Sequence, residues 1–541
     1  MSTRDFTFRA IRALALEILA CLVIAGCTVG PNFVPPTAAT PPQVFERTDA
    51  AQAPSKATET EFNSDWWTLF NDPTLNALEK QLADANLDVA AASARLRQSR
   101  AGQRIAGAAE LPTLDGAASY DRERGSPNGI LSLLGVPSLG PESQNASGKT
   151  PLGVAPIPGS KGSPAYNLYQ MGFDASWELD IWGGARRGVE EASALSDGSY
   201  EDRNAVLLSA RAELARDYVE LRDSQQLLNI AKQNLEIARN TTKLTQIRER
   251  DGVTTDLDVA NASAQAASIE SLIPTLETQC ETRINAIGVL LDEEPGALKQ
   301  TLGEPQEVPE LPGQVPIGFP SELAQRRPDI RRAEAQLHAA TASIGVAKAD
   351  FYPHISLNGS AGFQSLQLTS LASWASGQFV LGPSITMPIF EGGRLKGTLQ
   401  LREAQQQEAA IVYKRTVLEA WREVDDALVA YDAEQLRRDK LKEVVALNQR
   451  ALAVAQQRYK AGALDYLDVL NVQKQLLEGQ SNLEQSQATA AANLIELCKA
   501  LGGGWESTYA GQTPQADKGT AASQSQPVQA EQNASITAKA D

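Results

Sequence analysis

Two long stretches of the chain, residues 185–250 and 395–460, repeat their apolar positions with a helical period and contain no proline. Each has about 66 residues, so a continuous helix rising 1.5 Å per residue would be roughly 100 Å long. In the first stretch leucines recur every seven residues, at Leu207, Leu214, Leu221, Leu228 and Leu235. Because heptad spacing is typical of coiled-coil packing, we expect long helices that pack along one another.

Four shorter stretches alternate apolar and polar residues with period two, which predicts strands. They are residues 112–121, 169–182, 351–363 and 379–390. A sheet of a soluble protein with one solvent-exposed face would show the same alternation of apolar and polar residues. The stretches are also long enough for tilted strands of a membrane barrel.

The body from about residue 65 to 505 is an internal duplication. Near the start of each half, Asp88, Leu96 and Pro112 match Asp329, Leu337 and Pro353 at a constant offset of 241 residues. Further on, "RERDGVTTDLDVAN" from Arg248 matches "RYKAGALDYLDVLN" from Arg458 at an offset of 210. The first half therefore carries an extra loop of about 33 residues, roughly 124–165, whose Gly, Pro, Ser and Asn predict a surface position.

Each half thus reads as helix, strand, loop, strand, long helix, turn and helix, which gives a mainly α chain with four strands. Four strands cannot close a barrel, and open sheet edges are excluded from lipid. Two chains would give eight strands, an interior that side chains largely fill, whereas three chains would give twelve and leave a lumen. If the strands lie in a membrane, the sequence favours a trimer.

The N-terminus has the architecture of a signal peptide, with Arg4, Arg9 and Arg12 before an apolar run from Ala13 to Gly26. The run is too short to span a membrane, and Glu17 interrupts it. Its end, Val-Ile-Ala-Gly-Cys27, resembles a bacterial lipobox, in which the cysteine is lipidated. An ordinary secretory signal with an incidental cysteine is the alternative. Stable anchoring needs more than one acyl chain or a further membrane contact.

These segments divide the chain into five parts. We predict a lipoprotein signal peptide at 1–26, a lipid-anchored Pro-rich tether at 27–64, structural repeats at 65–305 and 306–505, and a disordered polar tail at 506–541.

Composition narrows the range of functions. The net charge is −17 and the pI about 4.8 without a basic block, which argues against nucleic acid. The chain has two His, His338 and His354, and three Met, so we expect no metal site and no cofactor. Cys280 and Cys498 read as buried free thiols, with a disulfide between them left open.

No phosphate loop, nucleophile elbow or Cys/His cluster occurs in the sequence, so we predict that the protein is not an enzyme. A periplasmic coiled-coil scaffold lipoprotein is the main alternative to a membrane channel. The alternating strands favour the channel, because a simple rod does not need two strand pairs inserted at matching places.

Several stretches resemble the TolC-like outer membrane factors, specifically their lipoprotein (NodT-like) branch of RND-type efflux systems. They are "CTVGPNFVPP" from Cys27, "GFPSELAQRRPDIRRAEAQLHAATASIGVAKADFYPHISLNGSAG" from Gly318, "IFEGGRLKG" from Ile389 and "RYKAGALDYLDVLNVQKQLL" from Arg458. The resemblance covers nearly all of residues 27–505.

This resemblance implies a homotrimer with a twelve-stranded transmembrane β-barrel in the outer membrane, continued through the periplasm by a twelve-helix α-barrel. It implies an exit duct that passively conducts substrates from an inner-membrane RND-type pump and a periplasmic adaptor (membrane fusion protein) to the outside. The partners are then the adaptor, the pump and outer-membrane lipid, with no nucleic acid.

The resemblance also assigns a periplasmic gate. Asp468 matches an acidic position that constricts the closed pore, and Asn471 matches a second position that is acidic in the family. Three Asp468 carboxylates a few ångströms apart would repel by roughly 1–4 kcal/mol per pair. Because Asn471 is neutral, the ring carries half the charge that two acidic positions would give it, which predicts weak selectivity for cations. Tyr459 and Asp258 match a pair that bridges neighbouring helices in the closed state, while Leu464 replaces the arginine of a second bridge.

The two helix–helix turns are the free periplasmic ends, and the family resemblance makes them the docking tip for the adaptor. Gly252 and Gly462 suit helix C-terminal caps, and Arg248 and Arg458 precede them by one turn. We expect these four residues to dock the adaptor, with a simple helix cap as the alternative. For Tyr459 and Asp258 the alternative is that they are solvated polar residues of a coiled coil. Arg326, Arg327, Pro328 and Asp329 are better explained as a helix start than as a functional motif.

Overall fold

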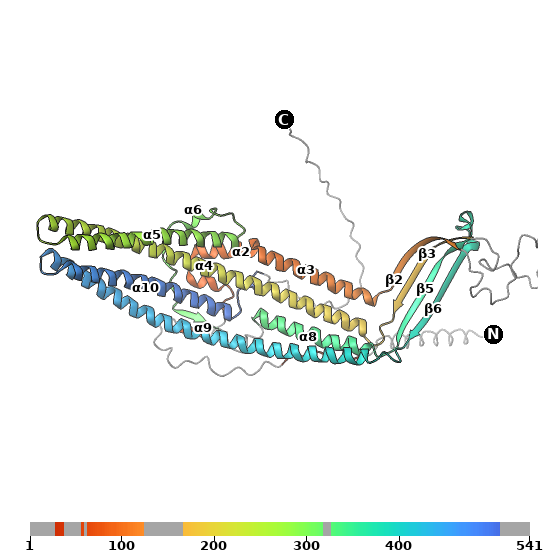
Figure 1. The fold of residues 1–541 in the computed structure, drawn as a ribbon. Helices are drawn as coiled ribbons and strands as arrows, with labels where there is room; N and C mark the ends of the chain where they lie inside the picture. The colour runs from red at the N-terminus through yellow and green to blue at the C-terminus, as the bar shows by residue number, and fades with distance from the viewer. Residues whose placement is uncertain (1–27, 37–55, 59–61, 124–165, 318–325, 509–541) are drawn as a thin grey trace, which may run out of the picture.

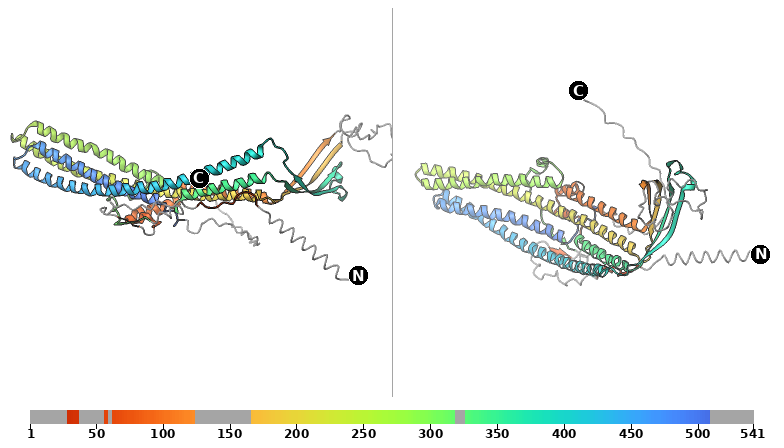
Figure 2. Two further views of the ribbon diagram at one scale, coloured as in Figure 1. Left: turned by 90° about the horizontal axis from the view of Figure 1, so that it is seen from below. Right: turned by 45° about the vertical axis from the view of Figure 1, so that its right-hand side comes forward.

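The computed structural model describes residues 28–36, 56–58, 62–123, 166–317 and 326–508. Two long helical hairpins form a rod, and a small sheet is attached to one end of it (Figure 1). The hairpin turns lie at the opposite end, which all views in Figures 1 and 2 show. The predicted signal peptide, Cys27, the 124–165 loop and most of the predicted tail lie outside the described residues.

The helices confirm the duplication. Helices α3 (Leu87–Gly107) and α8 (Pro328–Ala349) begin the two halves and start 241 positions apart. The long helices α4 (Gly184–Arg250) and α9 (Arg394–Lys460) have 67 residues each. They are followed by α5 (Asp256–Leu290) and α10 (Tyr466–Ala500), of 35 residues each. Both bounds of each of these pairs differ by 210 positions, as the sequence offset predicted.

Burial within α4 supports the heptad reading. Leu207, Leu214 and Leu221 are fully buried, and Leu235 is nearly so. These residues lie on the side of α4 that packs against its neighbours α3, α5, α8 and α10. Since apolar area removed from water stabilises by about 25 cal/mol per Å², this seam is a main source of the stability of the rod.

The four predicted strands are present as β2 (Thr113–Glu123), β3 (Tyr166–Glu178), β5 (His354–Ser365) and β6 (Gly377–Thr386). They form an antiparallel meander in the order β2-β3-β5-β6, so that β2 and β6 are edges. The 169–182 stretch leaves the sheet at Glu178 because Asp180 turns the chain. Its carboxylate accepts hydrogen bonds from the backbone N–H groups of Ala185 (3.1 Å) and Arg186 (3.0 Å) at the start of α4.

Two facing glycines let β3 and β5 approach closely at the centre of the sheet. Gly172 in β3 and Gly362 in β5 are register partners on the polar face. A Cβ atom on either glycine would lie within 3 Å of the Cα of the other. The two backbones can approach this closely only because both residues lack side chains.

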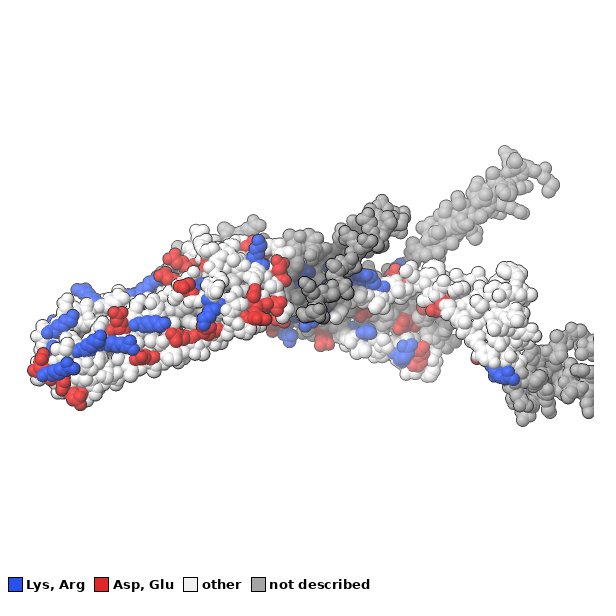
Figure 3. Space-filling view, turned by 90° about the horizontal axis from the view of Figure 1, so that it is seen from above, with Lys and Arg blue, Asp and Glu red and all other residues white. Residues whose placement is uncertain are grey.

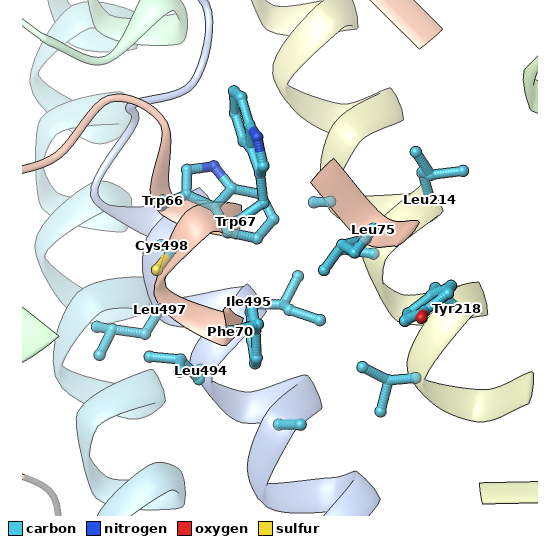
Figure 4. Close-up of a cluster of buried hydrophobic side chains, with 14 of the residues drawn as sticks. Trp66, Trp67, Phe70, Leu75, Leu214, Tyr218, Leu494, Ile495, Leu497 and Cys498 are labelled. Carbon is cyan, nitrogen blue, oxygen red and sulfur yellow. The ribbon is translucent and has the colours of Figure 1, made fainter. Parts of the chain in front are cut away.

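A second core lies midway along the rod, where residues 62–85 and the end of the described chain pack against the helices. It includes η2 (Trp66–Phe70), α2 (Pro73–Ala85) and α6 (Lys299–Leu302). Strand β1 (Lys56–Thr58) pairs in parallel with β4 (Gln314–Pro316) beside it. Figure 4 shows Trp66, Phe70 and Leu75 between Leu214 and Tyr218 of α4 and the end of α10.

The remaining described elements are short 3-10 turns around the strands: η3 (Ala108–Glu110), η7 (Leu368–Ser370) and η8 (Trp374–Ser376). Pro328 and Asp329 begin α8, as predicted for that motif. Cys280 and Cys498 are free thiols and form no disulfide. Within the described ranges, no helix is both long enough and apolar enough to cross a membrane.

The predicted tether contacts the body wherever the structure describes it. The backbone N–H of Val29 donates to the carbonyl of Trp182 (3.0 Å), and Arg187 donates to Asn32 (2.6 Å). The ring of Phe33 stacks on His338 with centroids 4.4 Å apart. We call residues 28–33 the strap. It lies against α4 and α8 at the junction of helices and sheet.

Candidate functional site: the helical tip and the polar face of the sheet

The two hairpin turns have the same backbone geometry. Gly252 and Gly462 adopt φ of 73° and 72°, the left-handed region that favours glycine. In each turn the residue after the glycine donates back to the arginine carbonyl five positions earlier. The bonds run from Val253 to Arg248 (2.8 Å) and from Ala463 to Arg458 (2.9 Å). Both turns are Schellman motifs, so the capping role predicted for the glycines is confirmed.

Arg248 crosses from the first hairpin to the second. Its guanidinium carbon lies 4.5 Å from the ring centroid of Tyr459, and its Nη1 donates to the Tyr459 carbonyl. The arginine thus combines a cation–π contact with a hydrogen bond to the end of α9. In this closed contact Arg248 is half-buried and holds the two turns together rather than pointing away from the tip.

Tyr459 is the centre of a buried cluster. Its hydroxyl lies 3.3 Å from the hydroxyl of Thr245, which is fully buried in α4. Its ring meets Tyr466 edge-on at 5.9 Å. Burial, with Tyr459 and Asp258 nearby, raises the pKa of Tyr466 to about 12. Tyr466 therefore carries its phenolic proton at neutral pH and packs against Tyr459 as a neutral group.

Among the described residues of one chain, the Asp258 carboxylate is bonded to groups other than Tyr459, and the bridge between Asp258 and Tyr459 in the assembled channel stays a prediction. The Asp258 carboxylate instead accepts from the hydroxyls of Thr254 and Thr255 and from the backbone N–H of Thr255 (3.2 Å). Hydrogen bonds from Thr254 and then Thr255 hold the pKa of Asp258 below its usual range. This carboxylate completes a capping box at the start of α5, which competes with any bond to the tyrosine.

Asp468, Asn471 and Arg458 are exposed on the described chain. Asp468 and Asn471 are three positions apart, so they lie on one side of α10. This placement leaves both side chains accessible to other copies of the chain or to a pore. Arg458 differs from its repeat partner Arg248, because its side chain makes no hydrogen bond or ion pair among the described residues.

The sheet has one apolar and one polar face, as its alternation predicted. On the polar face, Asp115 of β2 and Asp174 of β3 are direct register partners. Like charges placed opposite each other weaken a strand pair, so this pair costs stability. At the end near the helices, Glu178 lies 2.7 Å from His354 on the same face.

Charged side chains gather along the helical rod, whereas the sheet is nearly free of them in Figure 3. No group of three or more His, Cys, Asp or Glu side chains in the described ranges could hold a metal ion.

Comparison with known proteins agrees with this geometry. The family model described as "Outer membrane efflux protein" matches residues 78–291 and 319–503. The pyoverdine export outer membrane protein OpmQ of Pseudomonas aeruginosa is 30% identical over 498 residues, covering 91% of this chain and 97% of its own. Nodulation protein T of Rhizobium leguminosarum bv. trifolii is 28% identical over 491 residues, 90% of this chain and 96% of its own. The solved outer-membrane channel OprN matches with a TM-score of 0.77 and 32% identity, over 89% of this chain and 100% of its own.

Fold and matches together define a trimeric channel, in which three chains pool their strands into a β-barrel continued by helices. The chain belongs to the outer membrane efflux protein family. It is an outer-membrane efflux channel whose helical part lies in the periplasm. The unpaired edges β2 and β6 are where neighbouring chains complete the barrel, and its polar face lines the lumen.

Sequence reasoning found Tyr459 but not its partners Thr245 and Tyr466. A usable signal was present in the duplication. Arg248 and Arg458 occupy equivalent positions, so Tyr459, one residue beyond Arg458, must lie level with Arg248 across the two hairpins. The contact joins two repeats, and a comparison of each repeat with the other does not reveal which side chains meet.

Proposed function

We propose that this channel is the passive exit duct of a tripartite system, in which a periplasmic adaptor joins its tip to an inner-membrane RND-type pump. The pump supplies the energy, and the duct catalyses no reaction. The observation that carries the proposal is the cross-hairpin contact between Arg248 and Tyr459. It gives the tip a discrete closed arrangement that a partner can open.

The gate that we propose has two parts. Arg248, Thr245, Tyr459 and Tyr466 form a latch between the hairpins of each chain. The exposed Asp468 carboxylates, with Asn471 one turn further along, form the ring that narrows the passage in the trimer. Asp258 supports the latch indirectly, because it caps α5 directly below Tyr466.

We propose that the adaptor docks on the turns around Gly252 and Gly462 and on Arg458. Arg458 is exposed, whereas Arg248 is engaged inside the tip. A docking adaptor that pulls the turns apart would separate Arg248 from Tyr459. The two arginines thus take different roles, one in docking and one in closure, although the duplication relates them.

We also propose that Cys27 is lipidated and that the strap fixes its position. Thr28, the next residue, packs against Gly183 at the junction of β3 and α4. Acyl chains on Cys27 would then enter the membrane beside the end of the barrel that faces the helices. The bonds of Val29 and Asn32 hold the anchor to the body at that level.

A photo-crosslinking amino acid at position 458 tests the docking proposal in cells that express the full channel with its adaptor. Position 458 should capture the adaptor, and position 248 should capture it poorly. The matched control is position 422 of α9, an exposed arginine far from the tip. Capture at 422 as efficient as at 458 would count against docking by the tip.

A further inference from the structure

The apolar face of the sheet carries one charged residue among its described positions. This face consists of Leu114, Gly116, Ala118, Tyr120 and Arg122 of β2, together with the odd-numbered residues of β3, β5 and β6. All of these are apolar, aromatic, glycine or neutral polar residues except Arg122. Because the opposite face lines the lumen, Arg122 points toward the membrane side of the barrel.

Arg122 is held in a defined position. Its Nη1 donates to the side-chain oxygen of Asn167 at 3.0 Å, and the hydroxyl of Tyr120 donates to the same oxygen at 3.1 Å. The Tyr120 ring lies 4.9 Å from that of Tyr169. A guanidinium has five N–H donors, so this bond orients the group and uses one of them.

A hollow lies on the same face, further along the strands toward the helices. Its volume is about 730 Å³. In one register row, small and large residues alternate across the strands as Gly116, Phe173, Ala361 and Phe379. In the next row, the small Ala118 and Gly377 lie on either side of the paired Met171 and Phe363. The small residues leave room for the hollow between aromatic and thioether side chains.

Trp374, from the connection between β5 and β6, borders the hollow and is 92% exposed. That connection is at the end of the sheet remote from the helices, so it faces the outside of the cell (Figure 1). Tryptophan is favoured where hydrocarbon meets lipid headgroups. Along β2, Arg122 lies four positions beyond Ala118, or about 14 Å at 3.4 Å per residue.

Along the strands, from the helices toward the outside of the cell, the order is therefore an apolar hollow, a band of aromatic rings and then a single cation. This is the order of an acyl chain, the membrane interface and an anionic headgroup. An arginine near the interface costs far less on a lipid-facing surface than an arginine at the midplane. Arginine also binds phosphate through paired N–H···O bonds.

We propose that this face is a binding site for a phosphate-bearing lipid of the outer leaflet. One acyl chain lies in the hollow beneath Trp374, and the phosphate binds Arg122. The site depends on the outer-membrane position of the sheet and not on the proposed latch or lipid anchor. Its occupant would be a bound lipid that purifies with the trimer.

The test measures lipid retention on full-length trimers by native mass spectrometry. Three lipids are offered separately: lipid A, phosphatidylglycerol and a neutral galactolipid without phosphate. Arg122→Gln removes the cation, and Gly116→Leu fills the hollow. Arg122→Lys keeps a charge, and Ala175→Leu places a leucine side chain on this face outside the hollow. Heat-modifiable migration as a trimer shows that each variant is assembled.

We expect wild type and Ala175→Leu to retain lipid A equally. Arg122→Gln should weaken retention on the order of tenfold, as loss of one charge-assisted contact would do. Gly116→Leu should also weaken retention, because the leucine side chain occupies the space of the acyl chain. Arg122→Lys should recover part of the binding. Equal retention of lipid A by wild type and Arg122→Gln, equal retention of the galactolipid, or a preference for phosphatidylglycerol would each overturn the proposal.

Discussion

The guanidinium of Arg248 lies over the ring of Tyr459, 4.5 Å from its centroid, and so joins the last turn of α4 to the last turn of α9. The duplication supplies an arginine at the end of each long helix but a tyrosine at the end of only one. The residue of α4 that corresponds to Tyr459 is Glu249. The tip is therefore held by one asymmetric contact in each chain, although its two hairpins have equivalent backbones.

Replacing Arg248 by alanine should open the tip. The cation–π contact and the bond to the Tyr459 carbonyl are both lost, and a change of one or two kcal/mol shifts a two-state balance by about 5–30-fold. Planar-bilayer recordings should show the open fraction rising by that factor. Tyr459→Phe should have a smaller effect, because it removes only the contact with Thr245.

Arg458→Ala is the matched control for that experiment. It removes the same group from the equivalent, exposed position, and we expect closed-state conductance like that of wild type. Equal opening by Arg248→Ala and Arg458→Ala would mean that the charge of the tip matters and the latch does not.

Ion selectivity should depend on the lumen of the barrel as well as on the tip. Two register-paired carboxylates per chain, Asp115 and Asp174, bring six to one level in a trimer, twice the three supplied by Asp468. Such rings attract cations and repel anions. Asp115→Asn with Asp174→Asn should shift the reversal potential in a salt gradient toward zero. A larger shift with Asp468→Asn would instead identify the tip as the main filter.

Arg211 should be the most sensitive residue of the midway core. Its Nη2 donates to the hydroxyl of Thr508 (2.7 Å), and its guanidinium carbon lies 4.2 Å from the centre of the Trp67 ring. Its Nε is 3.8 Å from the fully buried Glu79. Arg211→Ala should cost about 3–5 kcal/mol, because it leaves Glu79 buried beside no cation.

Glu79→Gln should cost much less than Arg211→Ala. Burial raises the pKa of the Glu79 carboxyl well above its usual range, so a neutral amide resembles the state that burial favours. Comparing the temperatures at which trimers of the two variants dissociate checks this order. Equal losses would show that the charge of Glu79 is needed.

Asp223 should make stability depend on pH. Burial, with repulsion from Glu484 and Glu220, raises the pKa of Asp223 to about 6. The folded state therefore binds this proton more tightly than the unfolded state, whose aspartate titrates near 3.9. The contribution of this carboxyl to the stability of the folded state is fully present below pH 3.9 and is lost as the pH rises to about 6.

Asp223→Asn should accordingly stabilise the trimer at pH 7.5, by about 1–3 kcal/mol, and change little at pH 4. Thermal dissociation at the two pH values measures this difference. Asp84→Asn, at an exposed position of α2, is the control and should have little effect at either pH. Equal effects at both pH values would contradict the titration.

The strap should be required for firm attachment of the N-terminus. Phe33→Ala removes the stack on His338, whereas Val34→Ala changes a neighbouring side chain that is 76% exposed. We expect Phe33→Ala to speed proteolytic cleavage near residues 28–36 of the membrane-embedded trimer, and Val34→Ala not to do so. The same rate in both variants would show that the strap is not held by this stack.

The rod was predictable because its signals are local and repeated. The expected helix 185–250 differs from α4 by one residue at its start, since Gly183 and Gly252 delimit an uninterrupted heptad pattern. The strands were predicted from their alternation of apolar and polar residues. The stretch 169–182 was predicted to run beyond Glu178, where β3 ends, because the Asp180 side chain bonds to the start of α4. The strap and β1 were missed, since a Pro-rich segment gives no periodic signal and is ordered here by contacts with distant residues. The latch was missed because its contacts also join residues that are distant from one another in the sequence.

Gly172 and Gly362 have a consequence for how three chains fit together. Each chain must supply one third of the circumference of a cylinder with only four strands, so its sheet must turn through one third of a circle. The close approach of the two glycines on the inner, polar face leaves room for that turn at the middle of the sheet. A side chain at either position would push β3 and β5 apart on this face, so we expect it to flatten the arc and to prevent three chains from meeting edge to edge.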